Sequence, residues 1–188
     1  MAASKRSQST SIETTCHLKS PKVSQVFDYF VVIDFEAICD KDKIPHPQEI
    51  IEFPSVIVSG VTGQIETYFR TFVRPTHNQI LTYFCKDLTD IQQNQVDGGV
   101  TLFEALLMHD EWLEISGIKN SDFVVVTWSN CDCEVMIESE CKFKKIPKTA
   151  YFNRWINLRV PFHEVFGDMR CNLKKAVEIM GGSCSFCT

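Results

Sequence analysis

The pattern of apolar and polar positions is most informative between residues 30 and 36. Four apolar residues, Phe30 to Ile33, run directly into two carboxylates, Asp34 and Glu36, with one residue between them. An uninterrupted apolar run predicts a buried strand, and the acids place its carboxyl end at the surface. Side chains alternate between the two faces of a strand, so Asp34 and Glu36 point the same way while Phe35 enters the opposite layer.

Periodicity predicts both strands and helices in the rest of the chain. Alternation from Ile65 to Val73, after a turn at Thr62-Gly63, predicts a strand that returns antiparallel to the one before it. Helical periods follow, and apolar runs mark two later strands. The expected strands are 30–36, 56–58, 65–73, 123–126 and 155–158, and the expected helices lie near 80–88, 101–113, 132–141 and 173–180.

This order of elements is α/β, and we expect a mixed five-stranded sheet flanked by helices. The 188 residues, 44% of them hydrophobic and 23% charged, suit one domain with its own core, which we place at 25–188. Residues 1–24 are rich in Ser and Thr, show no apolar period and are expected to form a disordered leader.

Composition also indicates in which cellular compartment the protein is expected. No apolar run is long enough to cross a bilayer, so we expect no membrane association and an intracellular address in the cytoplasm or nucleus. The leader weakly resembles an organelle transit peptide, which keeps plastid and mitochondrion as alternatives. Nine cysteines without framework spacing fit a reducing compartment. The net charge of -5 argues against a general polyanion-binding surface.

A third carboxylate follows the second buried strand. Asp132 comes just past the 123–126 run, and pairing of that strand with the first would bring Asp132 within reach of Asp34 and Glu36. Three hard oxygen ligands at one sheet edge suit Mg²⁺ or Mn²⁺ rather than zinc. Two plainer interpretations remain open, namely solvated acids at a strand end and an Asp132 that only caps its helix.

The segment 142–163 contains no acid and interleaves basic with aromatic side chains. Cations for phosphates and rings for bases are what single-stranded nucleic acid requires, so Lys144 and Lys145 are candidate RNA contacts. Trp155 is assigned mainly to packing in a strand. His109 falls within the apolar stripe of its helix and is expected to be a partly buried packing residue rather than a ligand.

With these features the chain resembles the DEDD 3'-to-5' exonucleases of RNase H-like fold, and within them the DEDDh-type branch of enhanced-RNAi and histone-mRNA 3'-exonucleases. A lone Asp-x-Glu is a weak signal, but several matching segments in one order are specific. The resemblance runs from about Tyr29 to Met180. The matching segments are 33–37, 49–54, 73–75, 84–85, 95–97, Asp132 and 155–159.

The resemblance implies two-metal hydrolysis of the terminal phosphodiester at RNA 3' ends, with Mg²⁺ or Mn²⁺ as the cofactor. It implies that Asp34 bridges both cations, that Glu36 holds the metal on the nucleophile side, and that Asp132 anchors the other metal. Glu36 and the small Ala37 would also contact the terminal nucleotide. RNA is therefore the expected partner, while the natural RNA and the oligomeric state do not follow from the sequence.

Two departures from the family pattern bear on activity. Cys131 stands where typical members of the branch have Trp. The third motif, a general-base His and a fourth metal-binding Asp, is not found after the 173–180 helix, and neither His163, expected in a surface loop, nor Asp168 replaces it. Cys184-x-x-Cys187 lacks the second pair that a zinc site requires. We therefore expect a C-terminally truncated exonuclease domain that is weak or inactive.

Two other functions remain open. The first is a non-catalytic RNA-binding isoform of such an exonuclease, which keeps the basic aromatic segment without the chemistry. The second is a phosphatase or another carboxylate hydrolase that uses Asp34 and Glu36. Salt-sensitive RNA binding would identify the first, and hydrolysis of a small phosphoester the second.

Overall fold

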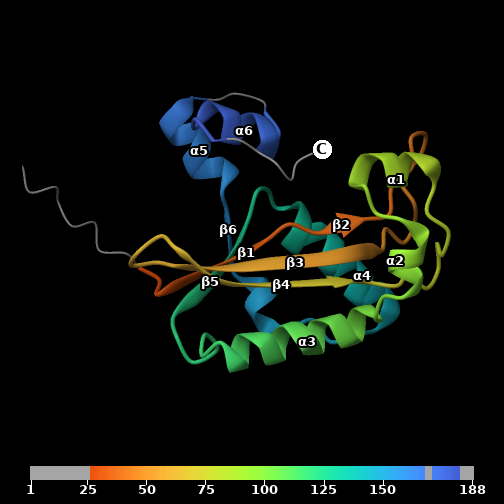
Figure 1. Cartoon of the computed structure of the whole chain (residues 1–188), viewed down its shortest axis with the longest axis horizontal. Helices are drawn as coiled ribbons and strands as arrows, with labels where there is room; N and C mark the ends of the chain where they lie inside the picture. Colours follow the sequence, from red (N-terminus) through yellow and green to blue (C-terminus); the bar gives the residue numbers. More distant parts are fainter. Residues whose placement is uncertain (1–25, 168–170, 183–188) are drawn as a thin grey trace, which may run out of the picture.

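A mixed sheet of six strands runs through the molecule, with helices on both sides (Figure 1). The computed structural model describes residues 26–167 and 171–182, so the expected leader at 1–24 lies outside the described residues. The strands are β1 (Tyr29–Ile33), β2 (Glu36–Ala37), β3 (Ile50–Ser59), β4 (Ile65–Phe72), β5 (Phe123–Thr127) and β6 (Trp155–Asn157). The helical segments are α1 (Tyr83–Thr89), α2 (Gln93–Asp97), α3 (Leu102–Ile115), the π-helical turn η1 (Cys131–Met136), α4 (Ile137–Lys144), the 3-10 turn η2 (Ala150–Asn153), α5 (Arg159–Phe166) and α6 (Leu173–Ile179).

The long strand β3 links the two halves of the sheet. It pairs antiparallel with β4 along one edge, and with β1 and then β2 along the other. β5 runs parallel to β1, and β6 runs parallel to β5. The antiparallel return after Thr62-Gly63 and the placing of the 123–126 strand beside the first strand are therefore confirmed. Within the described ranges, no helix is long and apolar enough to span a membrane.

The sheet has six strands where five were expected, because the first predicted strand is divided. β1 ends at Ile33, β2 begins at Glu36, and Glu36 pairs with Glu52 in the register that β1 has already set with β3. Asp34 and Phe35 leave the regular strand conformation between them. The alternation of faces survives the interruption, since Ile33 and Phe35 are both buried in the core while Asp34 is exposed.

Side-chain caps fix the helix starts. The helix expected from 101 is α3, and the structure shows that Thr101 and Glu104 form the capping box that opens it. The helix expected near 80–88 is α1 and starts after Thr82, because Thr82 has extended backbone and its hydroxyl accepts the N–H of Cys85.

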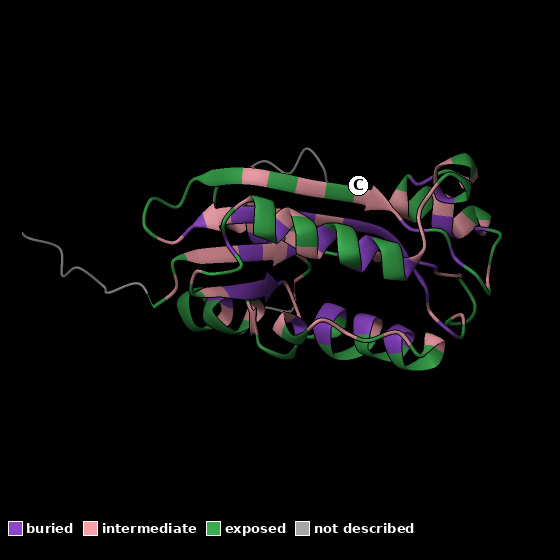
Figure 2. Ribbon diagram, turned by 90° about the horizontal axis from the view of Figure 1, so that it is seen from below, coloured by how far each residue is buried: buried purple, intermediate pink, exposed green. Residues whose placement is uncertain are grey.

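One face of the sheet packs against α3 and α4. Buried and exposed residues alternate along α3, as expected for a helix with one face on a sheet (Figure 2). α5 and α6 lie on the other side of the sheet from α3 (Figure 1). The main core includes Val31, Ile33, Phe35, Phe53, Ile57, Leu102, Leu106, Leu113, Val125, Ile137 and Phe152.

His109 lies inside this core and is fully buried rather than partly buried as expected. Its ring nitrogens lie 2.8 Å from the Tyr151 hydroxyl and 3.1 Å from the Ser55 hydroxyl, so both are satisfied. Burial lowers the pKa of His109 to about 3, which keeps the ring neutral near pH 7. The predicted packing role is confirmed.

A buried ion-pair network joins the end of α4 to the start of β3. The Nζ of Lys144 lies 2.8 Å from Glu49 and 2.6 Å from Glu140, and the Lys144 side chain is only 9% exposed. Glu49 also accepts backbone N–H groups of the loop 76–78, and Glu140 accepts the N–H of Ile50. Burial alone would raise the pKa of Glu49, but the bonds from Lys144 and the loop outweigh it and lower the pKa to about 2.

This network corrects the prediction that Lys144 contacts RNA. Its ammonium group is committed to two buried carboxylates, because unpaired charges at those positions would be costly. Its exposed neighbour Lys145 has no such partner among the described ion pairs, and its RNA contact stays a prediction.

We expect Lys144→Ala to lower the free energy of unfolding by about 3 kcal/mol, because it leaves Glu49 and Glu140 without their cation. Lys142→Ala is the matched control, since Lys142 is exposed on the same turn of α4, and its effect should stay within about 0.5 kcal/mol. Urea unfolding followed by circular dichroism measures both. Equal stabilities of the two variants would contradict the structural role of Lys144.

Candidate active site

The two carboxylates after β1 share one side of the sheet. Asp34 is exposed and Glu36 half-buried, while Phe35 between them is 4% exposed and points into the core. The ring of Phe35 packs edge-on against Phe53, with 4.8 Å between the ring centroids. This packing holds the backbone of Phe35 and thereby orients both acids, as the predicted alternation requires.

Asp132 contacts the backbone of Phe35, which lies between these two acids. Its Oδ1 accepts the N–H of Phe35 at 2.9 Å, although 97 residues separate the two positions. The parallel pairing of β1 with β5 puts the carboxyl ends of both strands at one edge of the sheet. Asp132 is buried in the π-helical turn η1, and such turns are frequent at functional sites. The predicted approach of Asp132 to the first strand is confirmed; its role in binding metal stays a prediction.

Two side chains of β6 hold the turn that leads to Asp132 through hydrogen bonds. The Oδ1 of Asn130 accepts hydrogen bonds from Nε1 of Trp155 at 3.1 Å and from Nδ2 of Asn157 at 3.0 Å. Trp155 is also partly buried against the core, which confirms its predicted packing role. Cys131, next in the chain, is exposed.

All three carboxylates resist ionisation. Desolvation raises the pKa of Glu36 to about 7, and repulsion by Asp34, Glu52 and Asp132 adds to it. Desolvation also raises the pKa of Asp132 to about 6, although the N–H of Phe35 opposes the rise. Asp34 is exposed overall, but protein around its carboxylate displaces water and raises its pKa. Negative charges that repel one another in this way attract a cation.

This donor set fits a hard divalent cation. Mg²⁺ prefers oxygen ligands and keeps several of its waters, so that one or two protein carboxylates are sufficient to hold it. In the part of the chain described, no three His, Cys, Asp or Glu side chains converge closely enough to enclose a metal directly. Asp34, Glu36 and Asp132 are the residues that would hold such a cation, and this role stays a prediction.

Ala37 ends β2 beside these acids and is 7% exposed. Its carbonyl accepts a weak hydrogen bond from the Sγ of Cys85 at 3.9 Å, which ties β2 to α1. The carbonyl of Cys39 accepts the hydroxyl of Thr82 in the same interface. α1 thus stabilises the end of the strand, and the substrate contacts of Glu36 and Ala37 stay predictions.

Lys145 lies at the opposite end of α4 from Asp132. It ends the helix with a positive φ of 55° and an exposed side chain. Thirteen helical residues from 132 to 144 span about 18 Å at 1.5 Å per residue. The candidate RNA contact at Lys145 is therefore separate from the carboxylates along the chain, and it stays a prediction.

Sequence reasoning missed Glu52 and Arg70. Glu52 is directly opposite Glu36, and its buried carboxylate accepts a hydrogen bond from Nε of Arg70 on β4. A signal was present, because Glu52 is a lone acid inside the apolar run from Ile50 to Phe53. A buried acid in a strand needs a partner, and only the pairing of strands shows which one it has.

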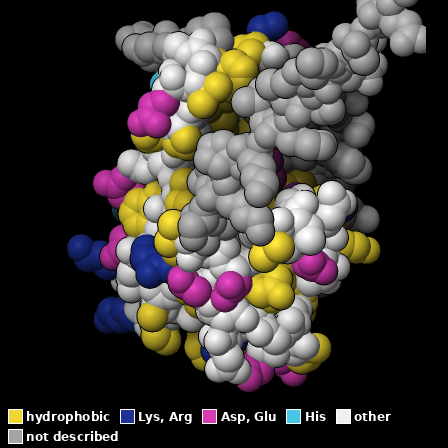
Figure 3. All heavy atoms as spheres, turned by 90° about the vertical axis from the view of Figure 1, so that its left-hand side faces the viewer, with side chains coloured by type: hydrophobic (Ala, Val, Ile, Leu, Met, Phe, Trp, Pro, Cys, Tyr) yellow, Lys and Arg dark blue, Asp and Glu magenta, His cyan; other side chains and the backbone are white. Residues whose placement is uncertain are grey.

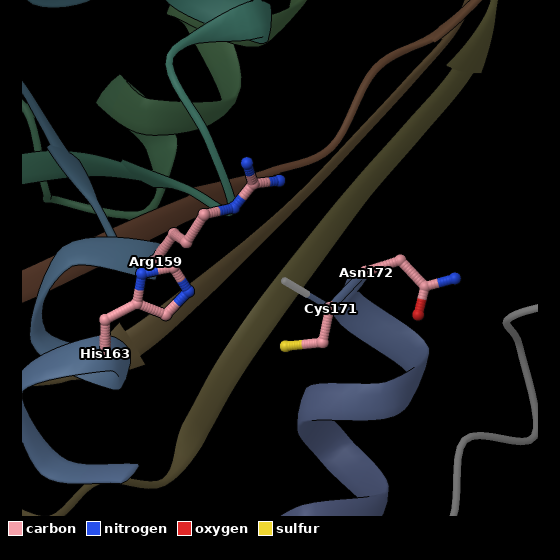
Figure 4. Close-up of a pocket in the computed structure, with 4 residues that line it drawn as sticks. All are labelled: Arg159, His163, Cys171 and Asn172. Carbon is pink, nitrogen blue, oxygen red and sulfur yellow. The ribbon is translucent and has the colours of Figure 1, made fainter. Parts of the chain in front are cut away.

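A separate cavity of about 490 Å³ lies at α5 and α6 (Figure 4). Its lining residues are Arg159, His163, Cys171 and Asn172. His163 is therefore on a helix, and the prediction of a surface loop was wrong, because 159–166 form the continuous helix α5. Asp168 and Cys184-x-x-Cys187 lie outside the described residues.

Basic and acidic side chains are interspersed on the surface at the end of the sheet where β3 turns into β4 (Figure 3). On this face charges of both signs are mixed, in keeping with the net charge of -5 of the whole chain.

The chain is similar to known nucleases over most of its length. The Exonuclease family, RNase T, matches residues 31–182. Human ERI1 exoribonuclease 2 is 38% identical over 182 residues, which cover 88% of this chain and 26% of that protein. Human ERI1 exoribonuclease 3 is 41% identical over 145 residues, which cover 76% and 43%. The 3'-5' exonuclease Snipper of Drosophila melanogaster is 34% identical over 173 residues, which cover 84% and 62%. The chain thus spans less than two thirds of each of these proteins.

Solved structures agree with this grouping. The nuclease domain of 3'hExo, a DEDDh family member bound to rAMP, superposes with a TM-score of 0.79 at 29% identity, covering 86% of this chain and 84% of that one. A 3'-exonuclease that recognises the histone mRNA stem-loop gives the same TM-score over 84% of this chain. The mixed sheet therefore has the expected RNase H-like fold. Because the Exonuclease (RNase T) family matches residues 31–182, the chain belongs to the DEDDh family of 3'-to-5' exonucleases.

Proposed function

We propose that this chain carries the nuclease domain of a metal-dependent exoribonuclease that hydrolyses the terminal phosphodiester at RNA 3' ends. The hydrogen bond from Phe35 to Asp132 carries the proposal, because it brings the third carboxylate to the first two. Similarity to ERI1 exoribonucleases and to a 3'-exonuclease of histone mRNA supports RNA as the substrate. The chain spans 26% and 43% of the two ERI1 relatives, so the substrate of the whole protein is part of this proposal.

The residues of the site have separable tasks in this reaction. Divalent cations, when bound, would polarise the phosphodiester and lower the pKa of the attacking water. Asp34 and Glu36 would hold them from β1 and β2, and Asp132 from η1. The N–H of Phe35 fixes one oxygen of Asp132 and so limits the directions in which that carboxylate can bind. Ala37, small and next to Glu36, would let the terminal nucleotide approach the backbone.

We also propose that a site made of these residues alone hydrolyses RNA slowly. Among the described histidines, His109 is in the core, His46 and His77 contact Phe143 on α4, and His163 lines the cavity at α5 and α6. A general base typically contributes about 10² to 10⁴ in rate. Because the sequence lacks the family's third motif, we assign no general-base histidine to the site and expect it to bind metal and RNA with slow hydrolysis.

A non-catalytic RNA-binding role is the second candidate. It is favoured by the end of α4, where Lys142 and Lys145 are exposed on either side of Phe143, itself 43% exposed. Two cations and a ring are suited to phosphates and a stacked base. This role needs no metal. RNA binding in experiments without divalent cations therefore distinguishes it from the nuclease function.

Asp34→Ala is expected to slow the shortening of a 3'-hydroxyl single-stranded RNA by about 10³-fold, because a lost ligand removes several kcal/mol of transition-state stabilisation. A labelled RNA with Mn²⁺ on a denaturing gel should show a ladder from the 3' end that disappears in the variant. Glu111→Ala on the exposed side of α3 is the control. Equal ladders for Asp34→Ala and the wild type, or cleavage of a small phosphoester instead of RNA, would count against the proposal.

Metal should stabilise the domain more at high pH than at low pH. The folded-state pKa values of Glu36, about 7, and Asp132, about 6, lie above their ordinary values of 4.5 and 3.8. The folded state thus keeps protons that the unfolded state has lost, and the stability of the metal-free domain falls as pH rises between about 4 and 7. Cations bind the ionised groups, so the rise in Tm with Mn²⁺ should be larger at pH 8 than at pH 5.5.

Differential scanning fluorimetry measures these Tm values with and without Mn²⁺. Glu36→Gln is the control, because it removes a ligand and should abolish most of the rise at pH 8. The same rise at both pH values would show that Mn²⁺ binds elsewhere.

Lys142→Glu with Lys145→Glu should weaken binding of single-stranded RNA by about tenfold at low salt without divalent cations, because two phosphate contacts are reversed in charge. Fluorescence anisotropy of a labelled oligonucleotide measures the dissociation constant. Lys174→Glu with Lys175→Glu, both exposed on α6, makes the same change in total charge and serves as the control. Unchanged binding in the double variant eliminates the RNA contact at α4.

A further inference from the structure

A row of charged side chains crosses three neighbouring strands beside the candidate site. Glu36 on β2 is opposite Glu52 on β3, and Nε of Arg70 on β4 donates to Oε1 of Glu52. Residues opposite each other in an antiparallel pair point to the same face, with Cβ atoms about 5 Å apart. Asp132 approaches from the other side, because β5 flanks β1 at the edge away from β3.

The burial of Glu52 distinguishes this row from an ordinary surface ion pair. The Glu52 side chain is 9% exposed, whereas the Arg70 side chain is 59% exposed. The guanidinium of Arg70 also lies over the ring of Phe72, 5.2 Å from its centroid, and Phe72 is the residue opposite Glu52 on β4. Ring and guanidinium together keep the Glu52 carboxylate on the β4 side, where little water screens it from Glu36.

We propose that Glu52 is a positioning residue for the nuclease reaction: held by Arg70, it repels the Glu36 carboxylate from β3 toward the cation position shared with Asp34 and Asp132. Like charges at directly opposite strand positions repel each other. Because the bond to Arg70 engages Glu52 on the side away from Glu36, Glu52 acts on Glu36 without becoming a metal ligand. This role rests on the function proposed above.

Glu52→Gln tests the role with a side chain of the same size. It removes the repelling charge and presents an amide that donates a hydrogen bond to Glu36, which would hold that carboxylate over β3. Mn²⁺ affinity, measured by electron paramagnetic resonance without RNA, should fall by about tenfold. kcat on single-stranded RNA at subsaturating Mn²⁺ should fall by a similar factor while KM for RNA stays within about twofold. Glu52→Asp keeps the charge and should recover part of the affinity.

Glu66→Gln is the matched control, because it makes the same change at an exposed position of β4 and should leave Mn²⁺ affinity unchanged. Asp34→Ala separates the two proposals. If Mn²⁺ binds Asp34→Ala as tightly as the wild type, the proposed metal site itself is wrong. If Asp34→Ala loses Mn²⁺ while Glu52→Gln binds it within twofold of the wild type, only the role of Glu52 is overturned.

Thermal unfolding shows whether Glu52→Gln remains folded at the assay temperature. If it does not, Glu52→Gln combined with Arg70→Leu removes the buried charge together with its partner, which is better tolerated than removing one partner alone. The double variant should show the same tenfold loss of Mn²⁺ affinity. A folded double variant with wild-type affinity would overturn the proposal.

Discussion

The hydrogen bond from the backbone of Phe35 to Asp132 is the contact on which the site depends. The strand is interrupted at this point, so the buried N–H of Phe35 needs a partner that the sheet does not supply. The carboxylate of Asp132 provides it, and the ring of Phe35 is fixed in the core at the same time. One residue therefore joins the first strand, the core and the turn before α4, with an acid on each side of it.

Two glutamates show how the surroundings decide between a structural and a chemical role. Glu49 is fully buried, and Lys144 with the backbone of the loop 76–78 lowers its pKa to about 2. Glu36 is less buried, yet desolvation and three neighbouring acids raise its pKa to about 7. Glu49 has a cation from the protein and fastens elements together, whereas Glu36 meets only like charge and is suited to a cation from solution.

Local pattern was a good guide wherever a residue acts through its own strand or helix. The alternation at 34–36, the helix start at Thr101 and the apolar run at 123–126 all appear in the structure as expected, since each depends on neighbours within four residues. The pattern failed for Lys144, which belongs to a basic segment in sequence but to Glu49 in space. It also failed for Glu52, whose partners are on adjacent strands.

The sequence by itself determined the strand that ends in two acids, the α/β order, and the resemblance to the DEDDh exonucleases that the comparisons bear out. Only the tertiary structure decided that Asp132 contacts the backbone of Phe35, that Lys144 pairs with the buried Glu49 and that Glu52 faces Glu36. The physical reason is the distance along the chain over which each interaction acts. Side-chain alternation and capping are set by the covalent chain over a few residues, but the ionic partner of a buried group is set by the register of strands that are distant in sequence.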